Sequence, residues 1–131
     1  GIMNVESALA AIEAGADAIV VSNHGGRVMD HMPGTAEVLP GIANAVGGRV
    51  KVLVDGGIRE GIDILKMLAL GADAVMIGRP VCIAAFGAGQ EGVSFYLQEK
   101  LNELKKAMIL TGCGSIGRID PSIIFRKKGD R

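Results

Sequence analysis

The chain has 131 residues, of which 49% are hydrophobic and only 3% aromatic, with no tryptophan. This length supports one modest domain, whose core must be built from Ala, Val, Ile, Leu and Met. Basic and acidic residues balance at 14 each, and the zero formal net charge argues against nucleic acid or an anionic membrane surface as a partner.

The predicted elements alternate between helices and short apolar strands. In chain order, the pattern predicts a helix over 5–14, a strand over 18–21, a helix over 35–46, a strand over 50–54, a helix over 61–70, a strand over 74–77 and a helix over 93–110. Asn4 can cap the first helix, and a glycine follows each helix. The strand over 18–21 is wholly apolar, which is typical of a strand buried on both faces.

This alternation predicts parallel strands joined by right-handed crossovers. Gly-Ala-Asp-Ala occurs at two helix-to-strand junctions, 15–18 and 71–74, which favours a repeated β/α unit. Three strands cannot close a (β/α)₈ barrel of ~250 residues, so the chain corresponds to about half of one or to a small open sheet. No G-x-G-x-x-G follows the first strand, which weakens a dinucleotide-binding interpretation.

Each predicted strand ends in a polar turn that contains glycine. These turns are SNHGGR at 22–27, DGGIR at 55–59 and GRP at 78–80. The carboxyl ends of parallel strands meet on one face of an α/β fold, and ligands bind there. The three turns therefore predict a single site.

The second and third turns predict an anion site. Gly56, Gly57 and Gly78 expose backbone N–H groups or let a ligand approach the chain. Arg59 and Arg79 can each grip phosphate oxygens in bidentate fashion. In barrels, the loops after the last two strands commonly bind phosphate. The alternative is ordinary turn chemistry beside surface arginines.

The first turn has the residue types of a catalytic site. His24 could act as a base near neutral pH, and Arg27 could fix a carboxylate beside it. The alternative is a capped structural histidine with a surface arginine, and the spacing alone does not decide between the two. His31 has no acidic or cysteine partner at ligand spacing, so we expect no metal site.

The remaining features predict an ordinary intracellular chain. Cys82 and Cys113 are too few and too far apart for a disulfide framework, and we expect buried, reduced thiols. No apolar run reaches the ~18 residues of a membrane-spanning helix, and no signal peptide is recognised, so we expect a cytoplasmic protein. Residues 126–131 are expected to form a basic, solvated tail beyond a folded unit over 1–125.

The motifs VVSNHGGR (20–27), LVDGGIREGIDILKMLALGADAVMIGRP (53–80) and TGC (111–113) together carry a family resemblance. They resemble the FMN-dependent α-hydroxy-acid oxidases and dehydrogenases, which include glycolate oxidase, lactate oxidase and flavin-linked L-lactate dehydrogenases. The resemblance implies a TIM barrel that binds FMN at its C-terminal face. This chain would supply the C-terminal part of that barrel, about strands 6–8 with their helices.

The resemblance also implies a role for each residue of the strand-end turns. His24 would be the base that takes a proton from the substrate, and Arg27 would bind the substrate carboxylate. Ser22 would contact the flavin. The FMN site would be lined by Asp55, Gly56, Gly57, Ile58 and Arg59, with Arg59, Gly78 and Arg79 at the phosphate. The reaction would be oxidation of a small 2-hydroxy acid to a 2-keto acid, with the flavin taking the electrons.

Family members use further groups that we do not find in this sequence, namely a lysine that would fall just before Gly1, tyrosines for the substrate and an aspartate that orients the histidine. Because turnover depends on a positioned constellation, we expect the 131-residue chain alone to have no significant oxidase activity. A half-barrel also leaves sheet edges and an apolar inner face uncovered, so we expect it to form a homo-oligomer.

Two other interpretations stay open. The chain could be a non-catalytic half-barrel that binds FMN, binds only phosphate, or serves as an assembly module. It could also come from another flavin or phosphate barrel, such as a relative of type 2 isopentenyl diphosphate isomerase or IMP dehydrogenase. The His-Gly-Gly-Arg spacing argues against the latter, because those families are not expected to need an arginine for an α-carboxylate.

Overall fold

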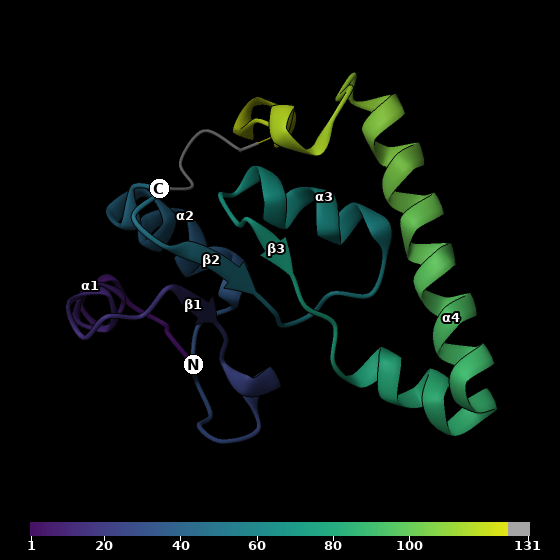
Figure 1. Ribbon diagram of the computed structural model, residues 1–131, viewed down its shortest axis with the longest axis horizontal. Helices are drawn as coiled ribbons and strands as arrows, with labels where there is room; N and C mark the ends of the chain where they lie inside the picture. The colour runs from purple at the N-terminus through teal and green to yellow at the C-terminus, as the bar shows by residue number, and fades with distance from the viewer. Residues whose placement is uncertain (126–131) are drawn as a thin grey trace.

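The computed structural model describes residues 1–125, which form an α/β arrangement around one sheet (Figure 1). The helices are α1 (Val5–Glu13), α2 (Thr35–Val46), α3 (Gly61–Ala69) and α4 (Arg79–Leu110), and the strands are β1 (Ala18–Val21), β2 (Lys51–Val54) and β3 (Ala74–Val75). Short 3₁₀ helices are η1 (His24–Gly26), η2 (Ile116–Arg118) and η3 (Pro121–Ile123). The predicted basic tail at 126–131 lies outside the described residues.

The sheet is parallel throughout, as the alternation of elements predicts. Its order is β1-β2-β3, with Val21 opposite Val54 and Val54 opposite Val75. Ile2 adds one parallel bridge to β1 at Val21, and its N–H donates to Val20 O at 2.9 Å. Since all three strands run the same way, their carboxyl ends lie at one edge of the sheet.

The core lies on one face of this sheet. Residues of β1 and β2 alternate along each strand between buried and less buried positions. The buried set joins strand and helix residues in one cluster, which includes Ala8, Ile19, Val21, Leu39, Ile42, Val46, Val52, Val54 and Met67. The expectation that the strand over 18–21 is buried on both faces is therefore wrong. The helices cover one face only, and Val20 on the other face is half-buried.

The helix α1 begins as its sequence predicts. The Asn4 side chain accepts the Ser7 N–H at 2.7 Å, which satisfies one of the free donors of the first turn. Glu6 lies in that same first turn, where a negative charge is favourable.

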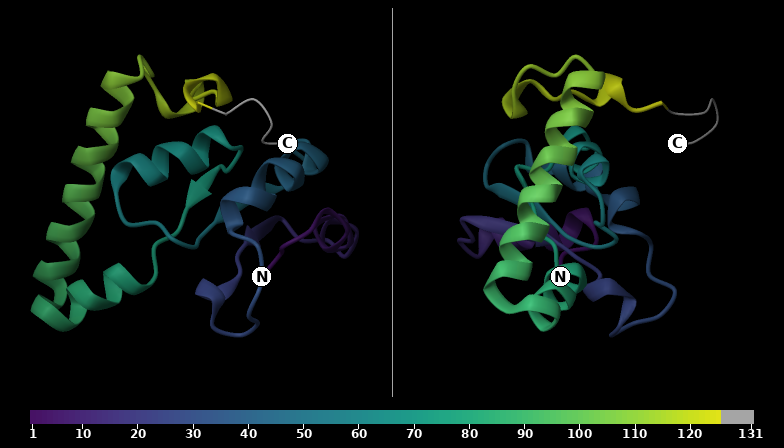
Figure 2. Two further views of the ribbon diagram at one scale, coloured as in Figure 1. Left: turned by 180° about the vertical axis from the view of Figure 1, so that it is seen from behind. Right: turned by 90° about the vertical axis from the view of Figure 1, so that its right-hand side faces the viewer.

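Two elements differ from the prediction near the end of the sheet. The strand β3 holds only Ala74 and Val75, so the predicted strand over 74–77 is too long. The helix α4 begins at Arg79, fourteen positions before the predicted start at 93. The backbone leaves helical geometry only at Ala88 and Gly89, where α4 bends sharply (Figure 2). The residues around this bend, 85–91, are exposed, and the glycine at 89 has a positive φ of 56°.

The helix α4 lies along α3, at the opposite end of the molecule from α1 (Figures 1 and 2). A second cluster of buried residues, Leu65, Leu104 and Ala107, joins the two helices. Gly61 is required at their closest approach, because a Cβ there would lie 2.3 Å from the Leu104 backbone nitrogen. The first residue of α3 therefore sits directly against α4.

Among the residues that the structure describes, no helix combines the length and the apolar character needed to cross a membrane. The cytoplasmic location stays a prediction.

Candidate functional site

The three strand-end turns line one pocket of about 660 Å³. Nine of the ten site residues named from the sequence contribute to its wall, namely His24, Arg27, Asp55, Gly56, Gly57, Ile58, Arg59, Gly78 and Arg79. Parallel pairing of β1, β2 and β3 brings these residues together from positions more than fifty apart in the chain. The expected meeting of the three turns at one edge is confirmed.

The tenth residue, Ser22, is not part of the pocket wall. Its hydroxyl oxygen accepts the His24 backbone N–H at 3.1 Å. Next to it, the Asn23 side chain accepts the Gly25 N–H at 3.0 Å and donates to Pro33 O at 3.2 Å. Two short polar side chains therefore fix the backbone of the histidine turn.

His24 has an unusual backbone conformation. Its φ of 54° lies in the left-handed region, which non-glycine residues rarely adopt. The hydrogen bonds that the Ser22 and Asn23 side chains accept hold the turn in this shape. Rare backbone conformations that the surroundings enforce are concentrated at functional sites. The His24 side chain is exposed on the pocket wall.

The second turn packs tightly against α2 and the first turn. The buried Thr35 hydroxyl donates to Asp55 O at 2.6 Å. A Cβ at Gly56 would lie 2.9 Å from that hydroxyl and 3.6 Å from Asn23 Oδ1, and the φ of Gly56 is 98°. Only glycine fits both constraints. The DGG backbone is thus fixed by packing and by φ.

Asp55, which lines the pocket, carries an unsatisfied polar atom. Its Oδ1 is buried and has no hydrogen-bond partner among the described residues. Native proteins rarely leave such an atom unpaired, because desolvation without a partner costs about 1–3 kcal/mol. A ligand that donates a hydrogen bond would satisfy it.

The third turn reaches across to the first. A Cβ at Gly25 would lie 2.9 Å from an Arg79 guanidinium nitrogen, so this side chain rests against the bare backbone of the histidine turn. Arg79 is also the first residue of α4, and Pro80 follows it. The N-terminus of a helix attracts negative charge, as the Arg79 guanidinium does. Both therefore favour an anion at this position.

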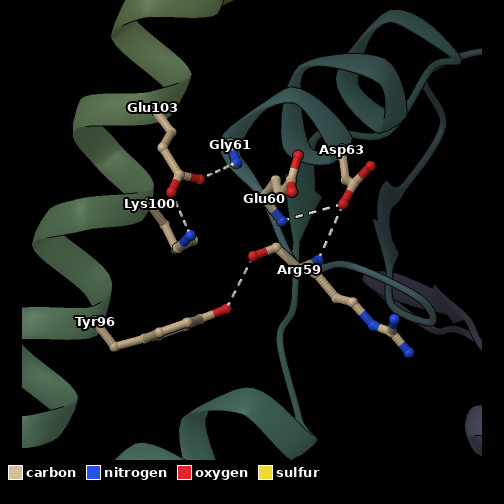
Figure 3. Close-up of polar contacts among 7 residues, drawn as sticks. All are labelled: Arg59, Glu60, Gly61, Asp63, Tyr96, Lys100 and Glu103. Atoms are coloured by element: carbon tan, nitrogen blue, oxygen red, sulfur yellow. Dashed lines mark hydrogen bonds and ion pairs between the residues drawn. The ribbon is translucent and has the colours of Figure 1, made fainter.

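Arg59 is held by its backbone, and its side chain makes no hydrogen bond or ion pair with another residue of 1–125. The N–H groups of Arg59 and Glu60 both donate to Asp63 Oδ2 at 3.1 Å. The Tyr96 hydroxyl donates to Arg59 O at 3.4 Å. Figure 3 shows the guanidinium extending away from Tyr96 and from the part of α4 that carries it.

The pocket is electropositive. Three arginines line it, and within residues 1–125 the ion pairs are His31–Asp30, Lys51–Asp73 and Lys100–Glu103. None of the three pocket arginines, Arg27, Arg59 and Arg79, takes part in these pairs. Guanidinium groups next to glycine backbone N–H groups form a binding site for an anion such as phosphate or carboxylate.

Other residues of the pocket wall escaped the sequence analysis. Tyr96, Met76 and Ile83 line it, and so does Cys82, which is exposed rather than buried as expected. Tyr96 comes from the second part of α4, whose course depends on the bend at Ala88 and Gly89. No local signal in the sequence could have indicated this position. Cys113, three residues after the end of α4, is half-buried.

The described residues contain no group of three or more His, Cys, Asp or Glu side chains that could hold a metal ion. His31 lies in an exposed loop, with Asp30 as its neighbour at 3.9 Å. The polar side chains on the pocket wall are those of His24, three arginines, Asp55, Tyr96 and Cys82.

Comparisons with known proteins show the family of the chain. The family model described as FMN-dependent dehydrogenase matches residues 1–126. An L-lactate dehydrogenase of Pseudomonas aeruginosa is 46% identical over 98% of this chain and 34% of its own length. A peroxisomal (S)-2-hydroxyacid oxidase of Arabidopsis thaliana is 48% identical over 91% of this chain and 33% of its own length.

Solved structures of the same kind are similar in fold. A mandelate oxidase variant carrying a monooxide FMN adduct has a TM-score of 0.89 and 51% identity, over 92% of this chain and 38% of that one. A lactate oxidase of Pediococcus acidilactici has a TM-score of 0.89 and 42% identity, over 91% of this chain and 33% of that one. The chain thus spans about a third of the length of these relatives. By the match of its sequence over 1–126, the chain belongs to the FMN-dependent dehydrogenase family.

Proposed function

We propose that this chain forms the C-terminal part of an FMN-binding TIM barrel that oxidises a small 2-hydroxy acid to a 2-keto acid. It would supply about strands 6–8 with their helices. The parallel sheet in sequential order and the similarity to mandelate and lactate oxidases support this assignment. The observation that carries it is the meeting of three strand-end turns in one electropositive pocket.

The residues at the pocket fit FMN. Arg59 and Arg79 would bind the phosphate together with the N–H groups near Gly57 and Gly78. The buried Asp55 Oδ1 has an unused acceptor position that a hydroxyl of the ribityl chain would satisfy. When bound, FMN supplies the redox chemistry by accepting the electrons of the substrate.

His24 and Arg27 would act on the substrate. An imidazole nitrogen of His24 takes the proton from the 2-hydroxy acid, and its turn is already fixed by Ser22 and Asn23. The Arg27 guanidinium, on the same pocket wall, binds the substrate carboxylate and orients it toward the base. Ser22 acts on the flavin site through the backbone of His24 in this arrangement.

The alternative of a non-catalytic half-barrel applies to the isolated chain. The relatives are about three times as long, and catalysis requires groups from more than one part of a barrel. The interpretation as an isopentenyl diphosphate isomerase or IMP dehydrogenase relative receives no support, since the matched relatives act on hydroxy acids by name.

We also propose that the isolated chain self-associates. Large apolar side chains on α4 are open to solvent, with Phe86 95%, Ile83 72% and Phe95 71% exposed. Ile83 and Phe86 are three residues apart and lie on the same side of the helix. Exposed apolar groups of this size favour burial against a second copy.

FMN titration of the purified chain, followed by flavin fluorescence, tests the phosphate site. Because a hydrogen bond to a charged group is worth about 1.5–3 kcal/mol, Arg59→Ala and Arg79→Ala should each weaken FMN binding at least about tenfold. Arg49→Ala is the matched control, since Arg49 donates to the Ala45 and Val46 carbonyls at the end of α2. Equal loss in all three variants, or none, would contradict the assignment.

Turnover by the isolated chain should be undetectable with L-lactate, glycolate or mandelate, even with FMN in excess. The reason is that the constellation around the base is incomplete in 131 residues. The assay follows reduction of an artificial electron acceptor, with FMN alone as the blank. Turnover that His24→Ala abolishes would overturn this expectation.

Multi-angle light scattering of the chain tests self-association. We expect a mass of at least two chains at micromolar concentration, and a shift toward the monomer in the double variant Ile83→Ser and Phe86→Ser. A monodisperse monomer for the unaltered chain would show that the exposed apolar side chains of α4 do not form an interface.

A further inference from the structure

The turn that carries Arg59 is held from two helices at three successive residues. Asp63 of α3 accepts the N–H groups of Arg59 and Glu60, and Glu103 of α4 accepts the Gly61 N–H at 2.7 Å (Figure 3). The Tyr96 hydroxyl, also on α4, donates to Arg59 O at 3.4 Å. Each backbone N–H from 59 to 61 thus donates a hydrogen bond to a carboxylate. The direction of the turn is therefore set before any ligand binds.

The backbones of α3 and α4 are in direct contact near Glu103. A Cβ on Gly61 would lie 2.5 Å from Glu103 Cβ and 2.3 Å from the Leu104 nitrogen, so the two helices touch through backbone. The Glu103 carboxylate also accepts from the Lys100 ammonium, one turn earlier on α4. Lys100 in turn lies over the Tyr96 ring, with its Nζ 5.4 Å from the ring centroid.

Glu103 and Lys100 are both charged near neutral pH, which keeps the contact with Gly61 in place. The hydrogen bond from Lys100, and then that from the Gly61 N–H, lower the pKa of Glu103. The hydrogen bond to Glu103 raises the pKa of Lys100. Both groups therefore stay charged across the neutral range, and the carboxylate keeps accepting the Gly61 N–H.

We propose that Glu103 is a positioning residue for the anion site, which holds the 59–61 turn against α4 so that the Arg59 side chain stays directed into the pocket. This inference rests on the proposed binding of the FMN phosphate by Arg59. Glu103 itself does not line the pocket and acts only through the backbone. A turn fixed in advance loses less conformational entropy when the phosphate binds.

Asp73, next to the sheet, provides a matched control for the Glu103 variants. Its carboxylate pairs with Lys51 at 2.7 Å and accepts the Val52 N–H at 2.9 Å, and these hydrogen bonds lower the pKa of Asp73. It thus has the same partners as Glu103, one lysine and one backbone N–H. Asp73 precedes β3, at the end of the sheet opposite the pocket.

The test compares Glu103→Leu, Glu103→Gln, Asp73→Leu and the unaltered chain in two measurements. Amide hydrogen exchange, followed by NMR, reports on the turn without any ligand. Titrations with FMN and with riboflavin, which lacks the phosphate, report on the anion site. Thermal unfolding of each variant confirms that it is folded under the conditions used.

In Glu103→Leu, we expect faster exchange at Arg59, Glu60 and Gly61, and a preference for FMN over riboflavin that falls about fivefold or more. Glu103→Gln keeps an oxygen acceptor for the Gly61 N–H. It should therefore keep most of the slow exchange at 59–61 and most of the preference for FMN. Asp73→Leu should change neither. This pattern would separate positioning from a general loss of stability.

Unchanged exchange at 59–61 in Glu103→Leu would overturn the inference, and so would a retained FMN preference despite faster exchange. A fall in FMN preference that Asp73→Leu reproduces would also overturn it, since it would then reflect stability alone. If the unaltered chain shows no preference for FMN over riboflavin, the proposed phosphate site fails, and the role of Glu103 in it fails too. That outcome is distinguishable, because the exchange data report on the turn independently.

Discussion

Parallel pairing of β2 with both of its neighbours is the constraint on which the rest of this structure depends. Parallel strands end at the same edge of the sheet, and so their loops must meet there. In this chain the three loops bring an imidazole, three guanidinium groups and the Asp55 carboxylate to the wall of one pocket. The same pairing leaves the opposite edge to the helix-to-strand junctions, where Asp73 binds Lys51 and the Val52 N–H. The two ends of the sheet therefore have different tasks, ligand binding at one and support of the strands at the other.

Close backbone contacts turn three separate loops into one site. Gly56 lets the second turn approach Thr35 and Asn23, and Gly25 lets the Arg79 side chain rest on the first turn. The missing side chain of Gly61 likewise lets α4 pack directly against the start of α3. At each of these three positions an added Cβ would come within 3 Å of a neighbouring atom: a side-chain atom of Arg79 or Thr35 at Gly25 and Gly56, and backbone of α4 at Gly61. Such rigidity is what an anion site needs, because guanidinium and phosphate groups bind best in fixed geometry.

Much of the fold and site could be predicted from the sequence, and the exceptions have physical causes. Local apolar runs and glycine stops predict the first three helices and the first two strands, and the rule for parallel strand ends then places His24 and Arg59 in one pocket. The sequence does not predict the early start of α4, because glycine has low intrinsic helix propensity and the segment between 79 and 92 holds three glycines. Tyr96 and Glu103 were not recognised as neighbours of the Arg59 turn for a related reason. Their places depend on the bend in α4 at Gly89, a long-range feature without a local signal.

The central claim is that the three strand-end turns of this chain together form a phosphate site. NMR mapping of the ¹⁵N-labelled chain during titration with inorganic phosphate tests it most directly, since this probe needs neither flavin nor substrate. The account predicts that saturable shifts concentrate on the backbone N–H groups of Gly57, Gly78 and Arg79 and on the Arg59 side-chain Nε. Shifts spread over exposed lysines, or confined to one turn, would contradict it.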